Sequence, residues 1–189
     1  MRMSILNTAT TEQILGERNF TNYPNLKTVT IKGVLSEISN SAFEGCKQIK
    51  SITATGAVNA TGKKVLQLGE CAFKDCTGLE SVEFTGNLAV SKNAFEGCTN
   101  LGSVKVKESD MALLENYAFL NCTKLTEADI PGKLLIQEGA FFECTSLKKF
   151  DFSNVSSIGK IAFYPFLARR LRPLRWEMNC VCYLLDRAS

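Results

Sequence analysis

Histidine is absent from this chain of 189 residues. Histidine is the commonest general base and metal ligand at neutral pH, so its absence excludes every histidine-containing catalytic triad and many metal sites of enzymes. No run of about 18 apolar residues occurs either, which excludes a typical transmembrane helix. The N-terminal segment contains no continuous apolar stretch after Arg2, so we predict no signal peptide.

A large net charge is also missing, because 22 Lys and Arg residues face 19 Asp and Glu residues and leave a net charge of +3. The excess is local: residues 164–189 contain five arginines and two acidic residues, so the rest of the chain is neutral. A neutral domain has no electrostatic reason to bind nucleic acid or an acidic membrane. We therefore expect no nucleic-acid partner and no membrane span.

One short motif, in contrast, recurs along the chain. It consists of Ala-Phe, a Cys three residues after the Phe, an apolar residue three positions later, and then apolar residues at alternate positions. A degenerate copy at Phe20 precedes the full copies, and the intervals between successive Phe residues are 23, 30, 22, 24, 22 and 22. A repeat this short decides the fold, because one unit cannot bury its apolar face without stacked neighbours. The full copies begin at Ala42, Ala72, Ala94, Ala118 and Ala140.

Each repeat has two halves. The first spaces its apolar residues three apart, which predicts a turn of helix or 3₁₀ structure, with Ser41 and Asn93 as examples of capping residues. The second half alternates, as in the stretches 79–84 and 147–152, and this predicts a strand with one buried face. One further buried residue is predicted five positions before each next Phe. These residues are Ile38, Leu68, Val90, Leu114, Ile136 and Ile158.

Periods of 20–29 residues with this strand pattern belong to leucine-rich repeats. The form Ile-x-x-x-Ala-Phe-x-x-Cys-x-x-Leu-x-x-Val-x-Ile covers residues 18–163 and resembles the BspA-like leucine-rich repeat family. The resemblance implies a right-handed solenoid, mainly β with short helical or 3₁₀ turns, and a parallel sheet along one face. It also implies a surface protein of bacteria or protists that adheres to host matrix or to other cells.

The repeat predicts three regions. We expect residues 1–17 to be an irregular lead-in or cap, and residues 18–163 to form about seven repeats, the last one incomplete. The surplus of the longest interval should lie in a surface loop around residues 55–64. Residues 164–189 lack the motif, and three interpretations stay open: a C-terminal cap, a frameshifted or truncated tail, or a basic helical docking segment, which Pro173 disfavours.

The cysteines and phenylalanines of the motif are predicted to be structural. A zinc site needs two to four ligands that converge on a point, whereas stacked repeats spread their cysteines along a line. Disulfides between coils are not excluded by distance alone, but buried reduced thiols are the simpler interpretation. Cys71 lies off the pattern, and Cys180 and Cys182 lie in the tail. The stacked Phe positions predict core packing rather than ligand binding.

The outward positions of the predicted strands carry Ser, Thr and charged residues in mixed columns. Such columns are typical of a recognition surface or of a merely solvated face, and no catalytic pair of carboxylates is evident. We predict a non-catalytic module without cofactor or metal, which binds a protein partner such as a host-matrix or cell-surface protein. The alternative is an intracellular interaction scaffold. The predicted partner-binding residues are Thr28, Thr30, Ser51, Thr53, Ser81, Glu83, Ser103, Lys105, Glu127, Asp129, Lys149 and Asp151.

Overall fold

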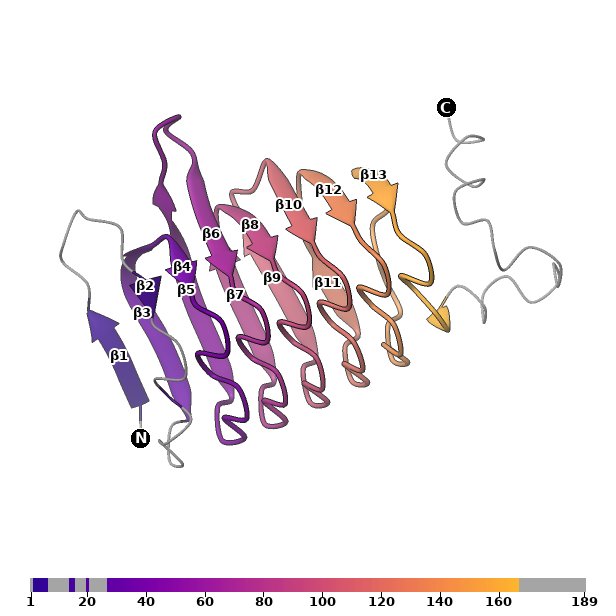
Figure 1. The fold of residues 1–189 in the computed structure, drawn as a ribbon, viewed down its shortest axis with the longest axis horizontal. Helices are drawn as coiled ribbons and strands as arrows, with labels where there is room; N and C mark the ends of the chain where they lie inside the picture. Colours follow the sequence, from indigo (N-terminus) through magenta and orange to yellow (C-terminus); the bar gives the residue numbers. More distant parts are fainter. Residues whose placement is uncertain (1, 7–13, 16–19, 21–26, 167–189) are drawn as a thin grey trace, which may run out of the picture.

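A computed structural model of the chain describes residues 2–6, 14–15, 20 and 27–166 (Figure 1). The chain winds as a solenoid in which successive coils stack along one axis. Each complete coil contributes one strand to each of two parallel sheets, and a segment of consecutive turns closes the coil. The leucine-rich-repeat solenoid that the sequence predicts is therefore confirmed. Within the described residues, no helix is long and apolar enough to cross a membrane.

Sheet A is formed by the alternating half of the repeats. Its neighbouring strands pair in parallel, and their inward residues Ile52, Val82 and Val104 are buried at one register position. The predicted parallel sheet with one buried face is thus present. In order along the stack, its strands are β1 (Arg2–Leu6), β3 (Thr28–Leu35), β5 (Ser51–Val58), β7 (Ser81–Thr85), β9 (Ser103–Lys107) and β11 (Glu127–Asp129).

A second parallel sheet, sheet B, was not expected. The sequence indicated one extra buried residue per repeat, and the structure places residues such as Leu68 and Val90 at the ends of short strands. Strands of two to five residues are too short to show a clear alternation, so only the most buried position was evident. These strands are β2 (Ile14–Leu15), β4 (Glu37–Ile38), β6 (Lys64–Leu68), β8 (Asn87–Val90), β10 (Met111–Leu114), β12 (Lys133–Ile136) and β13 (Val155–Ile158).

The long interval between Phe43 and Phe73 forms a β-hairpin. The end of β5 pairs antiparallel with the start of β6, through Ala57 with Val65 and Val58 with Lys64, and so links the two sheets. The hairpin projects beyond the other coils along one edge of the solenoid (Figure 1). The surplus residues lie where the sequence predicted them, but strand pairing extends into a region that we expected to be a loop.

The Ala-Phe-x-x-Cys segments form consecutive turns. The amide of Cys46 donates to the carbonyl of Phe43 at 3.0 Å, and the amide of Ile49 donates to the carbonyl of Cys46 at 3.3 Å. This i to i−3 spacing is that of 3₁₀ turns, as predicted. The predicted helix caps are wrong, because Ser41 and Asn93 have φ angles of 54° and 57°, in the left-handed region that interrupts a helix.

Hydrogen bonds between coils hold the turn segments in place. The amide of Phe43 donates to the carbonyl of Ala72, and that of Phe73 to the carbonyl of Ala94, both at 2.7 Å. Residues two positions before and two after the Phe adopt positive φ in coil after coil, mostly without glycine. These residues are Ser41, Gly45, Cys71, Asp75, Asn93, Gly97, Tyr117, Asn121, Gly139, Glu143 and Ile161.

The phenylalanines of the motif stack through the core. Neighbouring ring centroids are 4.5 to 5.2 Å apart, with interplanar angles of 2° to 17°. Because parallel strands are spaced by about 4.8 Å, ring stacking and strand pairing share one repeat and support each other. The predicted core role of these rings is confirmed. The stacked rings are Phe20, Phe43, Phe73, Phe95, Phe119, Phe141 and Phe163.

The two ends of the chain depart from expectation. Strands β1 and β2 lie within residues 1–17, which we expected to be irregular. The strand predicted for residues 147–152 is not formed, since only Lys149 makes an isolated bridge to Glu127. A strand at the end of a stack has one neighbour instead of two, and the alternating Phe residues of this stretch pack against Phe163 instead. The predicted tail beyond residue 166 lies outside the described residues.

Candidate functional site

The outer face of sheet A brings eleven of the twelve predicted residues into two straight rows. Six residues form row 1 through successive register pairs, and five residues form row 2 in the same way, two positions further along each strand. Row 1 consists of Thr28, Ser51, Ser81, Ser103, Glu127 and Lys149. Row 2 consists of Thr30, Thr53, Glu83, Lys105 and Asp129.

The chemistry of the two rows changes along the solenoid. On β3 and β5 every predicted residue carries a hydroxyl group, and β7 introduces the first charge at Glu83. On β9 and β11 the rows contain Lys105, Glu127 and Asp129, and all three are exposed. The hydroxyl half is less exposed, because Thr28, among others, is partly covered by neighbours. The charged half of the face is therefore the part most accessible to a partner.

An ion pair crosses this face diagonally. Lys107 Nζ lies 2.6 Å from Glu83 Oε1, although the register neighbour of Glu83 is Lys105. Lys105 and Asp129 are themselves register neighbours. Among the side chains that the structure describes, no ion pair engages either of these two residues. Their charges are therefore exposed and uncompensated by a close ionic contact.

Asp151 does not join the rows. Its carboxylate accepts a hydrogen bond from the Ser153 amide at 2.9 Å, and the donors of Ser153 lower the pKa of this carboxyl below its usual value. Asp151 thus closes a local turn after the isolated bridge at Lys149. The structure does not bring Asp151 together with the other predicted residues.

A third row was missed by the sequence analysis. Thr55, Thr85 and Lys107 follow row 2 at the next outward position and pair in register. The signal was present, because the alternation of β5, β7 and β9 continues for two more residues. The predicted strand over residues 79–84 ends at Phe84, its last large apolar residue, whereas backbone pairing extends one position further, to Thr85.

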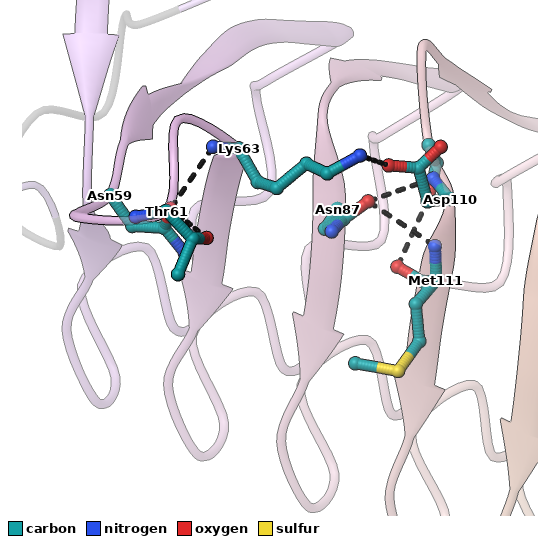
Figure 2. Close-up of polar contacts among 7 residues, drawn as sticks. Asn59, Thr61, Lys63, Asn87, Asp110 and Met111 are labelled. Carbon is teal, nitrogen blue, oxygen red and sulfur yellow. Dashed lines mark hydrogen bonds and ion pairs between the residues drawn. The ribbon is translucent and has the colours of Figure 1, made fainter.

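The hairpin offers a second surface that the sequence did not reveal. Lys63, at its tip, reaches past Asn87 to Asp110, two coils further along, as Figure 2 shows. Asn87 Oδ1 accepts the amides of Asp110 at 2.8 Å and Met111 at 3.2 Å, so it fixes the loop that receives Lys63. Val58, with 58% of its surface exposed, also lies at this hairpin.

The turn of the hairpin is organised by one side chain. Asn59 Oδ1 accepts hydrogen bonds from the amides of Thr61 and Lys63, each at 3.0 Å, and from the Thr61 hydroxyl at 2.7 Å. A neighbouring ion pair joins Lys64 to Glu108 at 2.7 Å. Two neighbouring residues near the tip of the hairpin, Lys63 and Lys64, therefore form ion pairs with the loop that precedes β10. The polar side chains of the hairpin support the structure of this edge rather than a reactive centre.

The five cysteines of the motif are buried and free, as predicted. Each thiol donates to the carbonyl of the motif Phe one coil earlier, for example from Cys76 Sγ to the Phe43 carbonyl at 2.9 Å. Burial raises the pKa of Cys46 to about 11 and raises that of Cys98 further. A protonated, hydrogen-bonded thiol is a poor nucleophile and a poor metal ligand. Among the described residues, no group of three or more potential metal ligands converges.

Comparison with known proteins finds a match to one family of repeat sequences. The sequence profile described as "BspA type Leucine rich repeat region (6 copies)" matches residues 2–67 and 60–167. No curated protein matches the chain at a significant level. Among solved structures, the chain is similar to the crystal structure of the T. pallidum leucine-rich repeat protein. The two share 18% identity with a TM-score of 0.45, over 79% of this chain and 84% of that one.

Proposed function

Because the chain belongs to the family of BspA-type leucine-rich repeat proteins, we propose that it is a non-catalytic protein-binding module that attaches its cell to a host-matrix or cell-surface protein. Leucine-rich repeats generally serve as protein-interaction scaffolds, since a stack of coils presents an extended and stiff surface. The partner-binding surface in this proposal is the outer face of sheet A, centred on its charged half.

The outer face of sheet A is chosen as the partner-binding surface because of the exposed charges of Lys105 and Asp129. They are register neighbours on β9 and β11, and no ion pair among the described residues engages them. A partner with the complementary arrangement gains two charge-assisted contacts without breaking an existing one. A few residues usually contribute most of the binding free energy of an interface. We therefore expect Lys105 and Asp129 to contribute more to it than the other residues of rows 1 and 2.

A double charge reversal tests this surface. Lys105→Glu combined with Asp129→Lys exchanges the two signs and keeps the net charge of the chain. We expect the variant to lose capture of the protein partner while its melting temperature stays unchanged, because both side chains are exposed. The matched control is Lys133→Glu with Glu70→Lys, which reverses two exposed charges outside sheet A.

The assay uses the full chain on beads and a detergent extract of fibroblast-derived extracellular matrix. Quantitative mass spectrometry compares the proteins retained by the native chain, the reversed variant and the control. Proteins retained by the native chain and the control, but not by the reversed variant, support the proposed surface. Equal retention by all three chains places the binding site elsewhere on the solenoid.

An intracellular interaction scaffold is the second candidate, and the free thiols favour it. All six cysteines among the described residues are unpaired, which is the usual state in a reducing compartment. Protease treatment of intact native cells, followed by immunodetection of the repeat region, separates the two candidates. Loss of the signal from intact cells supports adhesion. Full protection, with digestion in lysed cells as the control, refutes adhesion and supports the scaffold.

A further inference from the structure

The outer face of sheet B carries a row of apolar residues, unlike the outer face of sheet A. In β8, β10 and β12 buried inward residues alternate with partly buried or exposed residues that point outward. One outward residue of each strand belongs to the row, because Leu113 pairs in register with Ala89 on one side and with Leu135 on the other. Polar residues end the row, since Ala89 pairs with Gln67 and Leu135 pairs with Ser157.

Met111 widens this apolar row on β10. It lies two positions before Leu113 on the same side of the strand, and 45% of its surface is exposed. A contiguous apolar patch with polar surroundings is typical of a protein–protein interface, because water is displaced from it at little cost. We define the sheet B patch as Ala89, Met111, Leu113 and Leu135.

A column of exposed residues runs along the stack beside the sheet B patch. It contains the residue two positions after the end of each strand from β6 to β13, in the order negative, positive, neutral, negative, positive. Among the described side chains, no ion pair engages any of its four charged members. We define the charge column as Glu70, Lys92, Asn116, Glu138 and Lys160.

We propose that two copies of this chain form a dimer through the sheet B patch, about a two-fold axis that runs parallel to the strands and crosses β10. Such an axis reverses the order of the coils in the second copy, and the even spacing of parallel strands keeps facing residues in step. Leu113 then faces Leu113 of the second copy, Ala89 faces Leu135, and the polar residue Gln67 faces Ser157. The reversed row therefore places apolar residues against apolar residues and polar residues against polar ones.

The same axis brings opposite charges of the charge column together. Reversal about Asn116 places Glu70 opposite Lys160 of the second copy and Lys92 opposite Glu138, and symmetry repeats each contact once. Glu138 already accepts a hydrogen bond from the Tyr117 hydroxyl at 3.1 Å, which leaves its second carboxylate oxygen for the other copy. A charge order that complements its own reversal favours a second copy over an unrelated partner.

The size of the patch predicts a weak dimer. Five strands of about four residues cover roughly 24 Å by 13 Å, less than the roughly 800 Å² that each partner of a standard interface buries, so we expect a dissociation constant on the order of 0.1 mM. Sheet B lies in front of sheet A in Figure 1, so both outer faces of sheet A remain free in the dimer. If the function proposed above holds, the dimer binds two partners at once and gains avidity on a surface. Capture by single bead-bound copies does not need the dimer, so the two proposals fail separately.

Sedimentation velocity of the full chain, over a roughly hundredfold range of concentration up to about 0.5 mM, tests the dimer. We expect the mass to rise from monomer towards dimer across this range. Leu113→Glu places two like charges face to face at the axis and should remain monomeric throughout, whereas Thr85→Glu, at a partly buried outward position of sheet A, should dimerise as the native chain does. Circular dichroism checks that both variants fold. A native chain that stays monomeric, or a folded Leu113→Glu that dimerises normally, overturns the proposal.

Charge reversal tests the axis with exposed residues, whose substitution leaves the fold intact. Lys92→Glu and Glu138→Lys each place like charges opposite one another at two symmetric contacts, so each variant alone should dimerise roughly tenfold more weakly. In a mixture of the two variants, both contacts of the mixed dimer again join opposite charges. We expect sedimentation with a fluorophore on one variant to show association at the native affinity in the mixture. Single variants that dimerise normally, or a mixture that does not recover association, overturn this two-fold arrangement.

Discussion

Replacement of Phe95 by alanine tests whether the ring stack carries the stability of the solenoid. Phe95 is fully buried, and its ring lies 4.9 Å from Phe73 on one side and 4.9 Å from Phe119 on the other. Phe84, on β7, approaches it at 6.5 Å. Phe95→Ala therefore removes a ring from the middle of the stack and leaves a cavity lined by three other rings.

The backbone around Phe95 limits how far this cavity can collapse. The amide of Phe95 donates to the carbonyl of Ala118 at 2.8 Å, and the adjacent strands pair in parallel on both sides. Buried Phe to Ala substitutions cost about 3–5 kcal/mol, and the cost is largest where the surroundings cannot relax. We therefore expect a loss in the upper half of this range, about 4–5 kcal/mol.

Urea unfolding followed by far-ultraviolet circular dichroism measures the free energy of unfolding. Phe142→Ala is the control, because its ring is partly exposed and stacks on Tyr164 alone, at 5.5 Å, among the described rings. We expect the control to lose clearly less than Phe95→Ala, because its partly exposed ring gives up one aromatic pair, worth about 0.5–1.5 kcal/mol beyond area burial, and less buried area. A loss below about 1 kcal/mol for Phe95→Ala would refute the stacked-core argument, since such a value is typical of surface substitutions.

Two further predictions concern a buried thiol and the hairpin edge. The folded-state pKa of Cys46 is raised from 9.0 to about 11, so its contribution to stability is complete below pH 9 and is lost as pH rises towards 11. Urea unfolding across this range should show a shallower alkaline loss for Cys46→Ala than for the native chain, and parallel curves would contradict the expectation. Asn87→Ala removes the acceptor of two amides and should lower the free energy of unfolding by about 1 kcal/mol. Lys63→Ala, which breaks an exposed ion pair, is its control in the same measurement and should cost less; a larger loss for Lys63→Ala would reverse the ranking.

The periodic part of the fold could be read from the sequence. Each motif Phe and Cys recurs with nearly constant spacing, and a constant spacing in a stacked structure places the same residue at the same depth in every coil. The alternation of apolar and polar residues around Val82 and Val104 likewise predicted which side of sheet A is buried and which is exposed. For this reason eleven of the twelve predicted surface residues lie in straight rows.

Side-chain pairing on the surface was not predictable in the same way. Row membership depends on backbone register, but the choice of Lys107 over Lys105 as the partner of Glu83 depends on side-chain reach. The sequence predicts Asp151 as an outward residue of a strand over residues 147–152, but that strand does not form, and Asp151 closes a local turn instead. The candidate site was thus predictable as a face of the sheet but not as a set of contacts.

Local sequence determined which residues are buried in each coil, because burial follows from the alternation and spacing of apolar side chains along the chain itself. The tertiary structure alone decided the second sheet, the hairpin and the left-handed turns. Short strands such as β8 exist because the coils before and after supply hydrogen-bond partners. Positive φ at residues such as Asn93 is likewise held by hydrogen bonds from neighbouring coils. Contacts between coils, which no single repeat contains, stabilise all three features.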